Sequence, residues 1–187
     1  FKALKIEKFI TIKINSIGCP KCRPNIFKKL KEIFLKKTNF AKLCPDCKKR
    51  VKKNPFRVLD CKNKNCQKIA KKAPVILDLL CNDCTNHFRQ VLEYLDEAKV
   101  PYDLDNTLAR GLDYYTKTVF EVVKKGDYAK KEVLAGGGRY DSLLEKYGAP
   151  AQPAGGVAIG VDRTINLLKE KKIRLPQEKK TEVFIAQ

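Results

Sequence analysis

The chain has 187 residues, of which 43% are apolar, so it can form one domain or two small ones and is not a disordered protein. No window approaches 18 consecutive apolar residues, so we expect no membrane-spanning helix. The formal net charge is +19, and it is uneven: residues 1–100 hold 25 basic and 9 acidic side chains, whereas residues 101–187 hold 15 and 12. The basic first half indicates either a surface that binds a polyanion or a lysine-rich face exposed to solvent.

The first residues predict one helix end and one strand. Apolar side chains at positions 1, 4 and 6 indicate the end of a helix over residues 1–8, and β-branched residues over 9–15 predict a strand. The chain begins at Phe1 and contains no Met, so we expect it to be part of a longer protein.

Residues 18–100, which we call the helical module, are predicted to be mainly helical. Apolar side chains at positions 26, 27, 30, 33 and 34 have helical spacing, and a longer helix with one apolar face is predicted over 85–98. The pair Asn54-Pro55 marks a turn between helices. Short loops that carry cysteines separate the helical stretches.

All eight cysteines lie in the helical module, in pairs of C-x-x-C or, once, C-x4-C spacing. The pairs are Cys19 and Cys22, Cys44 and Cys47, Cys61 and Cys66, and Cys81 and Cys84. Two thiolates of one tight turn can bind one metal ion, and two such turns complete a tetrahedral site. The pattern therefore predicts one or two structural zinc ions.

A disulfide framework and a redox pair are the alternatives for these cysteines. Short C-x-x-C spacing rarely forms structural disulfides, and a redox site needs one pair rather than four. His87 lies three residues after Cys84 and could replace a thiolate, but its place on an amphipathic helix favours an ordinary helix residue.

Beyond Pro101 the pattern changes to strands and turns. We expect a strand over 114–123, a turn over 124–127 and a partner strand that starts at 132–134. A short helix over 139–147 should end at Gly148, followed by a glycine-rich strand over 155–160, a helix over 161–171, a linker around 175–180 and a last strand over 183–186. This order predicts an α+β fold in which the helical module is inserted into a sheet domain.

Three motifs lie in one order in this second half. They are Arg-Gly-Leu-Asp-Tyr-Tyr at 110–115 followed by Thr-Val-Phe-Glu at 118–121, Gly-Gly-Gly-Arg-Tyr-Asp at 136–141, and Gly-Val-Ala-Ile-Gly-Val-Asp-Arg at 156–163. They resemble the histidine-specific signature, the glycine-rich strand and the class II motif 3 of histidyl-tRNA synthetases. The run Ile-Asn-Ser-Ile-Gly at 14–18 extends the resemblance to nearly the whole chain. It implies an antiparallel class II synthetase-type sheet with flanking helices, carrying a mainly helical zinc-knuckle insertion.

The resemblance implies that ATP, with Mg, activates histidine to histidyl-adenylate, and that the histidine is then transferred to tRNA(His). It also implies a homodimer in the cytoplasm and an insertion that contacts the acceptor arm of the tRNA. The implied divisions are catalytic core at 1–17 and 101–172, insertion at 18–100, and a linker with the start of a truncated anticodon-binding domain at 173–187. Motifs 1 and 2 are absent, so the chain alone is expected to be inactive.

Charge develops on phosphate oxygens in this reaction, and an arginine fork can bind two oxygens at once. The resemblance assigns Arg110 as the catalytic residue, on the histidine carboxylate and the α-phosphate of ATP, and Arg163 to the γ-phosphate. Glycines would let substrate approach the backbone, with Gly138 and Gly160 assigned to ATP.

The resemblance places Tyr114, Tyr115 and Tyr140 around the imidazole of histidine, where phenolic hydroxyls read the ring nitrogens. Neighbours on a strand point to opposite faces, which favours Tyr115 over Tyr114 as the pocket residue. Arg139 is expected to form a structural pair with Asp141. Asp162 stands where the family commonly has Glu, a shorter side chain for any contact there.

Two alternatives remain for the function. The regulatory subunit of ATP phosphoribosyltransferase shares this fold, but it usually lacks both the intact motif at 110–115 and an insertion. A non-catalytic zinc module that binds RNA would explain the cysteines and the charge but not motif 3 with its glycine-rich strand. Binding of ATP by the complete protein separates this second alternative from a synthetase.

Overall fold

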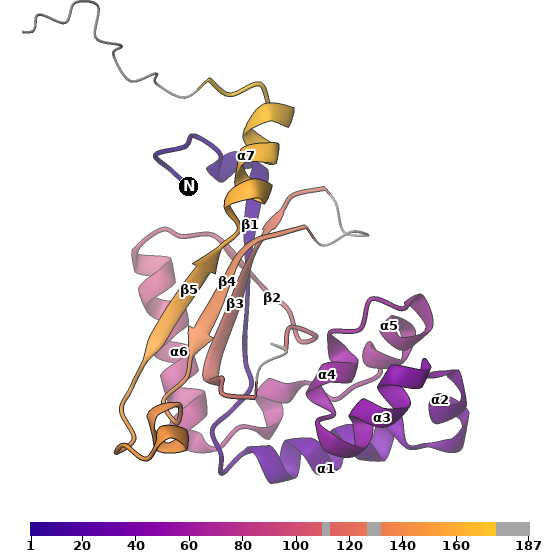
Figure 1. Cartoon of the computed structure of the whole chain (residues 1–187). Helices are drawn as coiled ribbons and strands as arrows, with labels where there is room; N and C mark the ends of the chain where they lie inside the picture. Colours follow the sequence, from indigo (N-terminus) through magenta and orange to yellow (C-terminus); the bar gives the residue numbers. More distant parts are fainter. Residues whose placement is uncertain (110–112, 127–131, 175–187) are drawn as a thin grey trace, which may run out of the picture.

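Five strands form one sheet, in the spatial order β2-β1-β3-β4-β5 (Figure 1). The structure is a computed structural model and describes residues 1–109, 113–126 and 132–174. The strands are β1 (Ile10–Ser16), β2 (Tyr102–Leu104), β3 (Thr116–Lys124), β4 (Val133–Arg139) and β5 (Gly155–Ile159). Together with seven α-helices in the described ranges, they make a mixed α+β fold, which confirms the predicted class.

The chain leaves the sheet after β1 and returns to it at β2. β1 is rich in β-branched residues and pairs with β3 along its whole length, from Ile10 opposite Lys124 to Ser16 opposite Thr118. β2 pairs with the other edge of β1, in parallel. The expectation of a wholly antiparallel sheet is therefore wrong for this pair, and β2, only three residues long, was not predicted.

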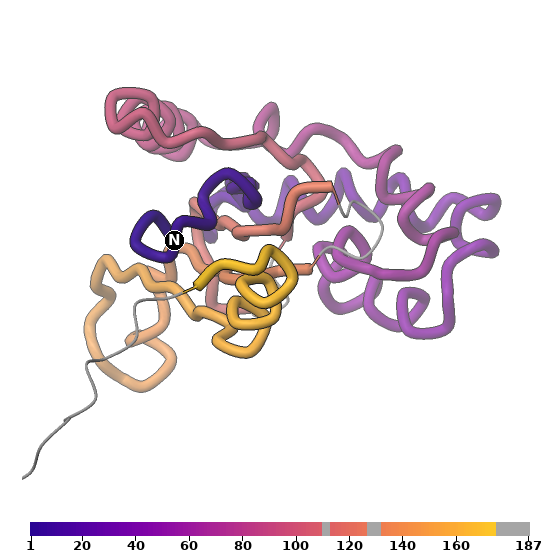
Figure 2. The backbone as a smooth tube through the Cα atoms, turned by 90° about the horizontal axis from the view of Figure 1, so that it is seen from above, coloured from indigo at the N-terminus to yellow at the C-terminus, as the bar shows by residue number. Residues whose placement is uncertain are grey.

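Most of the helices between β1 and β2 gather beside the sheet, whereas α6 lies along the sheet and contacts β3 (Figure 1). Figures 1 and 2 both show α1 to α5 on one side of the molecule, apart from α7. The bounds are α1 (Arg23–Phe34), α2 (Lys37–Lys42), α3 (Pro45–Lys53), α4 (Phe56–Leu59), α5 (Lys64–Ala70), α6 (Asn82–Glu97) and α7 (Val161–Glu170). The described residues also contain three 3-10 helices: η1 (Glu7–Phe9) before β1, η2 (Ile76–Leu79) between α5 and α6, and η3 (Leu144–Tyr147) between β4 and β5. Among the described helices, none is long and apolar enough to span a bilayer.

Two groups of buried side chains hold these elements together. The larger lies in the helical module, where Ile26, Leu30 and Phe34 of α1 are fully buried, and it continues to Tyr115 and Val119 at β3. The smaller lies between the sheet and α7 and is formed by Ile6, Ile10, Val122, Leu134, Ala135, Leu167 and Leu168. The core of the helical module is thus joined to the start of β3.

Several predicted boundaries differ from the structure. Residues 1–8 form turns and the start of η1 rather than a helix end, and the strand predicted from 114 begins at Thr116. Arg139 is the last residue of β4 and not the start of a helix, although Gly148 does end η3 in the left-handed conformation, with φ of 82°. The predicted linker and strand over 175–186 lie outside the described residues.

Glycines in β4 let β5 approach closely. A Cβ built on Gly137 would meet the backbone carbonyl oxygen of Gly156, so two main chains would have to separate. We expect Gly137→Ala to lower the free energy of unfolding by about 1–3 kcal/mol, the usual cost of overpacking, measured by chemical denaturation.

The matched control is Gly155→Ala in the neighbouring strand. Its Cβ would lie 3.5 Å from the nearest atom, the carbonyl oxygen of Gly138, which is an ordinary contact. Equal unfolding midpoints for the two variants would contradict the close approach of β4 and β5.

Candidate functional site

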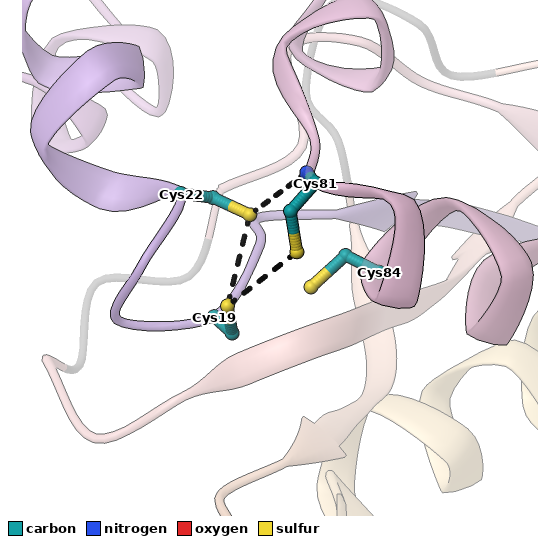
Figure 3. A group of neighbouring side chains, drawn as sticks. All are labelled: Cys19, Cys22, Cys81 and Cys84. Carbon is teal, nitrogen blue, oxygen red and sulfur yellow. Dashed lines mark hydrogen bonds between the residues drawn. The ribbon is translucent and has the colours of Figure 1, made fainter.

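Four thiols meet where the helical module joins the sheet, and we call them the first cluster. Cys19 and Cys22 precede α1, and Cys81 and Cys84 lie at the start of α6. Figure 3 shows their sulfur atoms turned toward one another. The Cys19 sulfur lies 3.7 Å from that of Cys22 and 3.9 Å from that of Cys81.

The other four thiols form a second cluster inside the helical module. Cys44 and Cys47 lie at the start of α3, Cys61 follows α4, and Cys66 lies in α5. The sulfur atoms of Cys44 and Cys61 are 3.9 Å apart. In each cluster all four sulfurs lie within 4.8 Å of one another, and all eight thiols are free rather than joined in disulfides.

These spacings fit a tetrahedral metal site. A zinc–sulfur bond of about 2.3 Å places two ligand sulfurs of a tetrahedron about 3.8 Å apart, close to the distances above. Backbone N–H groups also donate to the sulfurs: Cys81 N to Cys22 at 3.1 Å and Cys44 N to Cys66 at 3.3 Å. Such donors stabilise thiolates and orient them. Both clusters can therefore hold a zinc ion with four sulfur ligands.

The surroundings act differently on different thiols. Burial raises the pKa of Cys19, but hydrogen bonds from the Cys22 and Lys21 backbone and the Cys84 thiol outweigh it and lower the pKa to about 7. The backbone of Cys47 likewise lowers the pKa of Cys44. Burial raises the pKa of Cys22, Cys47, Cys66 and Cys84. Four thiolates packed together thus need a cation to offset their charge, which a metal ion supplies.

His87 belongs to neither cluster. It lies on α6, and its Nε2 atom is 3.4 Å from the hydroxyl of Thr118 in β3. Burial, assisted by the charges of Arg139 and Lys117, lowers the pKa of the ring. The expectation that His87 is an ordinary helix residue and not a metal ligand agrees with this place.

Three tyrosine rings gather at the end of β4. The ring centroids of Tyr114 and Tyr115 are 4.7 Å apart, and Tyr140 lies 5.8 Å from Tyr114 and 6.3 Å from Tyr115. The expectation that Tyr114 and Tyr115 point to opposite faces of a strand is therefore wrong. Both residues precede β3, so the alternation of a strand does not apply to them.

The backbone around Tyr140 is held by hydrogen bonds to Thr116 at the start of β3 and to Ala154 just before β5. Arg139 donates two hydrogen bonds to the carboxylate of Asp141, at 3.1 and 3.2 Å, which confirms the predicted pair. Burial raises the pKa of Asp141, but the hydrogen bonds from Arg139 and from the Ala154 backbone outweigh burial. The pKa of Asp141 is therefore lowered. The Asp141 backbone N–H donates to the Thr116 hydroxyl at 3.1 Å, so Asp141 joins the start of β3 to the chain before β5.

Two glycines leave room for the tyrosine rings. A Cβ on Gly156 would lie 2.6 Å from the Tyr140 hydroxyl, and one on Gly138 would lie 2.6 Å from the Thr118 carbonyl and 3.0 Å from the Tyr115 ring. Any larger residue would displace a ring or a strand at these positions.

A cleft of about 1100 Å³ separates the sheet from the helical module. Arg163 and Gly160 line its sheet side, where Arg163 donates to the carbonyl of Val133 at 2.7 Å. Gly138 is not among the lining residues and lies instead with the tyrosines. Asp162 is exposed in the first turn of α7, and Arg110 lies outside the described residues.

A model of the family described as histidyl-tRNA synthetase matches residues 40–164, more than half of the chain. The chain belongs to this family. A histidine–tRNA ligase of Caldicellulosiruptor bescii is 48% identical over the whole chain, and one of Clostridium perfringens is 44% identical over 95% of it. The apo histidyl-tRNA synthetase of Staphylococcus aureus has a TM-score of 0.66 and 33% identity over 90% of the chain.

The chain spans about two fifths of the length of these synthetases: 43% of the C. bescii ligase, 41% of the C. perfringens ligase and 40% of the S. aureus chain. It matches the family on both sides of the cleft, because the matched range includes α3 to α5 of the helical module as well as β3 to β5.

The histidyl-tRNA synthetase motifs account for only one wall of the cleft. The helical module supplies the other, including Asp60, Lys62, Gln67 and Lys71. Sequence analysis missed these residues because a lysine in a chain with 40 basic side chains carries no positional signal. Glu121 and Glu132 add carboxylates on the sheet side.

Proposed function

We propose that the chain is part of a histidine–tRNA ligase, which joins histidine to the α-phosphate of ATP, releases pyrophosphate, and transfers the histidine to tRNA(His). One observation carries this proposal. Three motifs that are far apart in the sequence meet on neighbouring strands: the first enters β3, the second ends β4, and the third spans β5 and α7. The predicted divisions into core, insertion and truncated anticodon-binding domain belong to the same proposal.

The tyrosines Tyr114, Tyr115 and Tyr140 form the proposed histidine site. The edge-on packing of Tyr140 on the other two rings, and the glycines in contact with Tyr115 and Tyr140, support this role. A neutral imidazole has one N–H donor and one acceptor nitrogen, and a phenolic hydroxyl can serve either one. The rings exclude water and orient the amino acid for attack on the phosphate.

ATP is proposed to bind on the sheet side of the cleft, with Mg as its companion ion. Arg163 would hold the γ-phosphate, and Gly160 would let the nucleotide approach the backbone. Gly138, which the resemblance also assigns to ATP, lies beside the Tyr115 ring, where histidine and the α-phosphate would meet. Glu121 and Glu132 offer carboxylate oxygens in the same cleft, the ligands that Mg prefers. Arg110 is the proposed catalytic residue, on the histidine carboxylate and the α-phosphate.

Each thiol cluster is proposed to hold one structural zinc ion. The sulfur spacings and the backbone donors support four-coordinate thiolate sites. A zinc ion in the first cluster would link the two ends of the helical module, after β1 and at the start of α6. A zinc ion in the second cluster would link α3, α4 and α5. Zinc has no redox chemistry here, and its contribution is to fix the fold of the helical module.

The helical module is also the proposed contact for the acceptor arm of tRNA(His). Lys62 and Lys71 line the cleft opposite the sheet and would meet phosphates of the acceptor end. Counterion release then makes binding depend steeply on salt, at roughly 0.7 to 0.9 log units per log unit of salt for each phosphate. A homodimer in the cytoplasm, which the resemblance to the family implies, belongs to the same proposal.

A chimera tests the proposed function. This chain replaces the matching 43% of the C. bescii ligase, and the product is assayed for ATP–pyrophosphate exchange and for charging of tRNA(His). We expect ATP–pyrophosphate exchange that depends on histidine. The chain would supply the histidine site and Arg163, and the C. bescii ligase would supply the rest of the catalytic core.

Arg163→Ala in the same chimera is the matched control, and it should lose exchange while keeping the circular dichroism of the folded protein. A folded chimera without histidine-dependent exchange would contradict the proposal. If such a chimera bound tRNA but not ATP, the RNA-binding zinc module would be the better description.

A further inference from the structure

The backbone just before β3 is held by side chains from the helical module. Arg23 donates from one guanidinium nitrogen to the carbonyl of Asp113, at 3.2 Å, and from the other to the carbonyl of Tyr115. Asn54 donates to the carboxylate of Asp113 at 2.5 Å. The segment Asp113–Tyr115 therefore has three hydrogen bonds to donors that lie 59 or more residues away along the chain.

Arg23 is placed by the first cluster. It directly follows Cys22 and is the first residue of α1, so the position of the Cys22 thiol sets where the guanidinium begins. The cluster is itself joined to the start of β3, because the amide of Lys117 donates to the carbonyl of Gly18 at 2.9 Å, next to Cys19. A Cβ on Gly18 would lie 2.7 Å from the Cβ of Cys22, so this loop has little room to shift.

Asn54 is placed by the second cluster. It ends α3, whose start carries Cys44 and Cys47, and its side-chain oxygen accepts from the amide of Phe56 at 3.0 Å. Phe56 begins α4, which leads to Cys61. The cysteines before Asn54 and those after it thus belong to the same cluster. A metal ion in the second cluster would fix the turn that carries the Asn54 side-chain amide.

We propose that Arg23 and Asn54 are positioning residues that couple the two metal clusters to the tyrosine site. Metal binding fixes the two donors, the donors fix Asp113–Tyr115, and the Tyr115 ring is thereby seated against Tyr140. The inference rests on the proposed function, both for the metal in the clusters and for histidine as the ligand of the tyrosines. Its consequence is that loss of metal loosens the tyrosine site.

The first test needs no catalytic activity. Hydrogen exchange is measured over residues 113–117 in the whole chain, with each cluster loaded with cobalt, whose thiolate absorption reports intact metal sites. We expect Arg23→Ala to keep the cobalt spectrum and to speed exchange in this segment by about tenfold or more, because two hydrogen bonds to a charged donor are lost. Asn54→Ala should have a smaller effect in the same segment, since it removes one.

The matched controls are the neighbouring exposed lysines. Lys21→Ala and Lys53→Ala remove a side chain beside the same cluster and should leave exchange over 113–117 unchanged. Arg23→Lys keeps the charge without the fork, so we expect it to restore only part of the protection. Unchanged exchange in both Arg23→Ala and Asn54→Ala, with cobalt bound, would overturn the coupling. If Arg23→Ala loses the cobalt spectrum, Asn54→Ala decides the question from the other cluster.

The second test separates this inference from the proposed function. In the C. bescii chimera, Arg23→Ala should raise the KM for histidine by about tenfold or more and change kcat less, because binding is weakened before the chemical step. Faster exchange together with an unchanged KM would support the coupling and contradict the assignment of the tyrosines to histidine. A raised KM with unchanged exchange would overturn the coupling.

Discussion

Two zinc ions per chain are expected in the purified protein, one in each cluster of four thiols. The sequence alone allowed one or two, but the structure divides the eight cysteines into two complete sets of four. Sulfur–sulfur distances of 3.7 and 3.9 Å in the first set and 3.9 Å in the second match a tetrahedral thiolate site. Elemental analysis of the protein after gel filtration measures the stoichiometry.

Removal of the zinc should unfold the helical module. Its buried residues include five of the eight cysteines, and these thiols fill space that apolar side chains occupy in a larger core. The binding energy of structural zinc, about 10–16 kcal/mol per ion, is folding energy when no site exists in the unfolded chain. We expect a strong chelator to abolish most of the helical circular dichroism, and added zinc to restore it.

Single ligand substitutions provide the control for this prediction. Cys84→Ser should reduce the content to one zinc by disabling the first cluster, and Cys47→Ser should do the same through the second. Lys49→Ala, an exposed substitution near Cys47, should retain two ions. A metal-free chain that keeps its helical signal and reacts with a thiol reagent at all eight cysteines would rule the structural zinc out.

The partition of the cysteines could not be predicted from their spacing. A C-x-x-C pair shows that two thiols share a turn, but it does not show which two turns meet. In the structure the outermost pairs meet, because β1 ends at Ser16 just before Cys19 and α6 begins beside Cys81. The inner pairs are then brought together by the short helices α3, α4 and α5, of which α3 packs on α1 and α4, and α4 packs on α5. Long-range packing, which no local pattern encodes, decides the pairing.

The element types of the sheet could be predicted because their signals are local. β-branched runs in β1 and β3, glycine-punctuated β5 and amphipathic α7 each carry a pattern of their own. The tyrosine geometry could not be predicted, since Lys117 has a positive φ of 52° and the register shifts between Thr116 and Val119. Because of this irregularity, the alternation of side chains between the two faces of β3 does not extend to Tyr115. Arg23 and Asn54 also gave no signal, because their partners are backbone carbonyls and an aspartate 59 or more residues away.

Arg110→Ala is expected to lower the rate of histidyl-adenylate formation by about 100-fold or more in the C. bescii chimera, about 3 kcal/mol of transition-state stabilisation. In the first step, the carboxylate of histidine attacks the α-phosphate and negative charge builds on the phosphate oxygens. A guanidinium that holds both groups aligns the attack and offsets this charge. The residue lies three positions before Asp113, which Arg23 and Asn54 hold in place.

Arg110→Lys is the informative second variant, because it keeps the charge and removes the fork. A single ammonium cannot span a carboxylate and a phosphate oxygen together, so little rescue is expected. The transfer of histidine to tRNA should be affected less, since the α-phosphate is by then already joined to the amino acid. Single-turnover measurements of the two steps separate these effects. Near-normal adenylate formation in Arg110→Lys would mean that Arg110 only supports the site, and that the catalytic cation comes from the part of the synthetase that this chain does not cover.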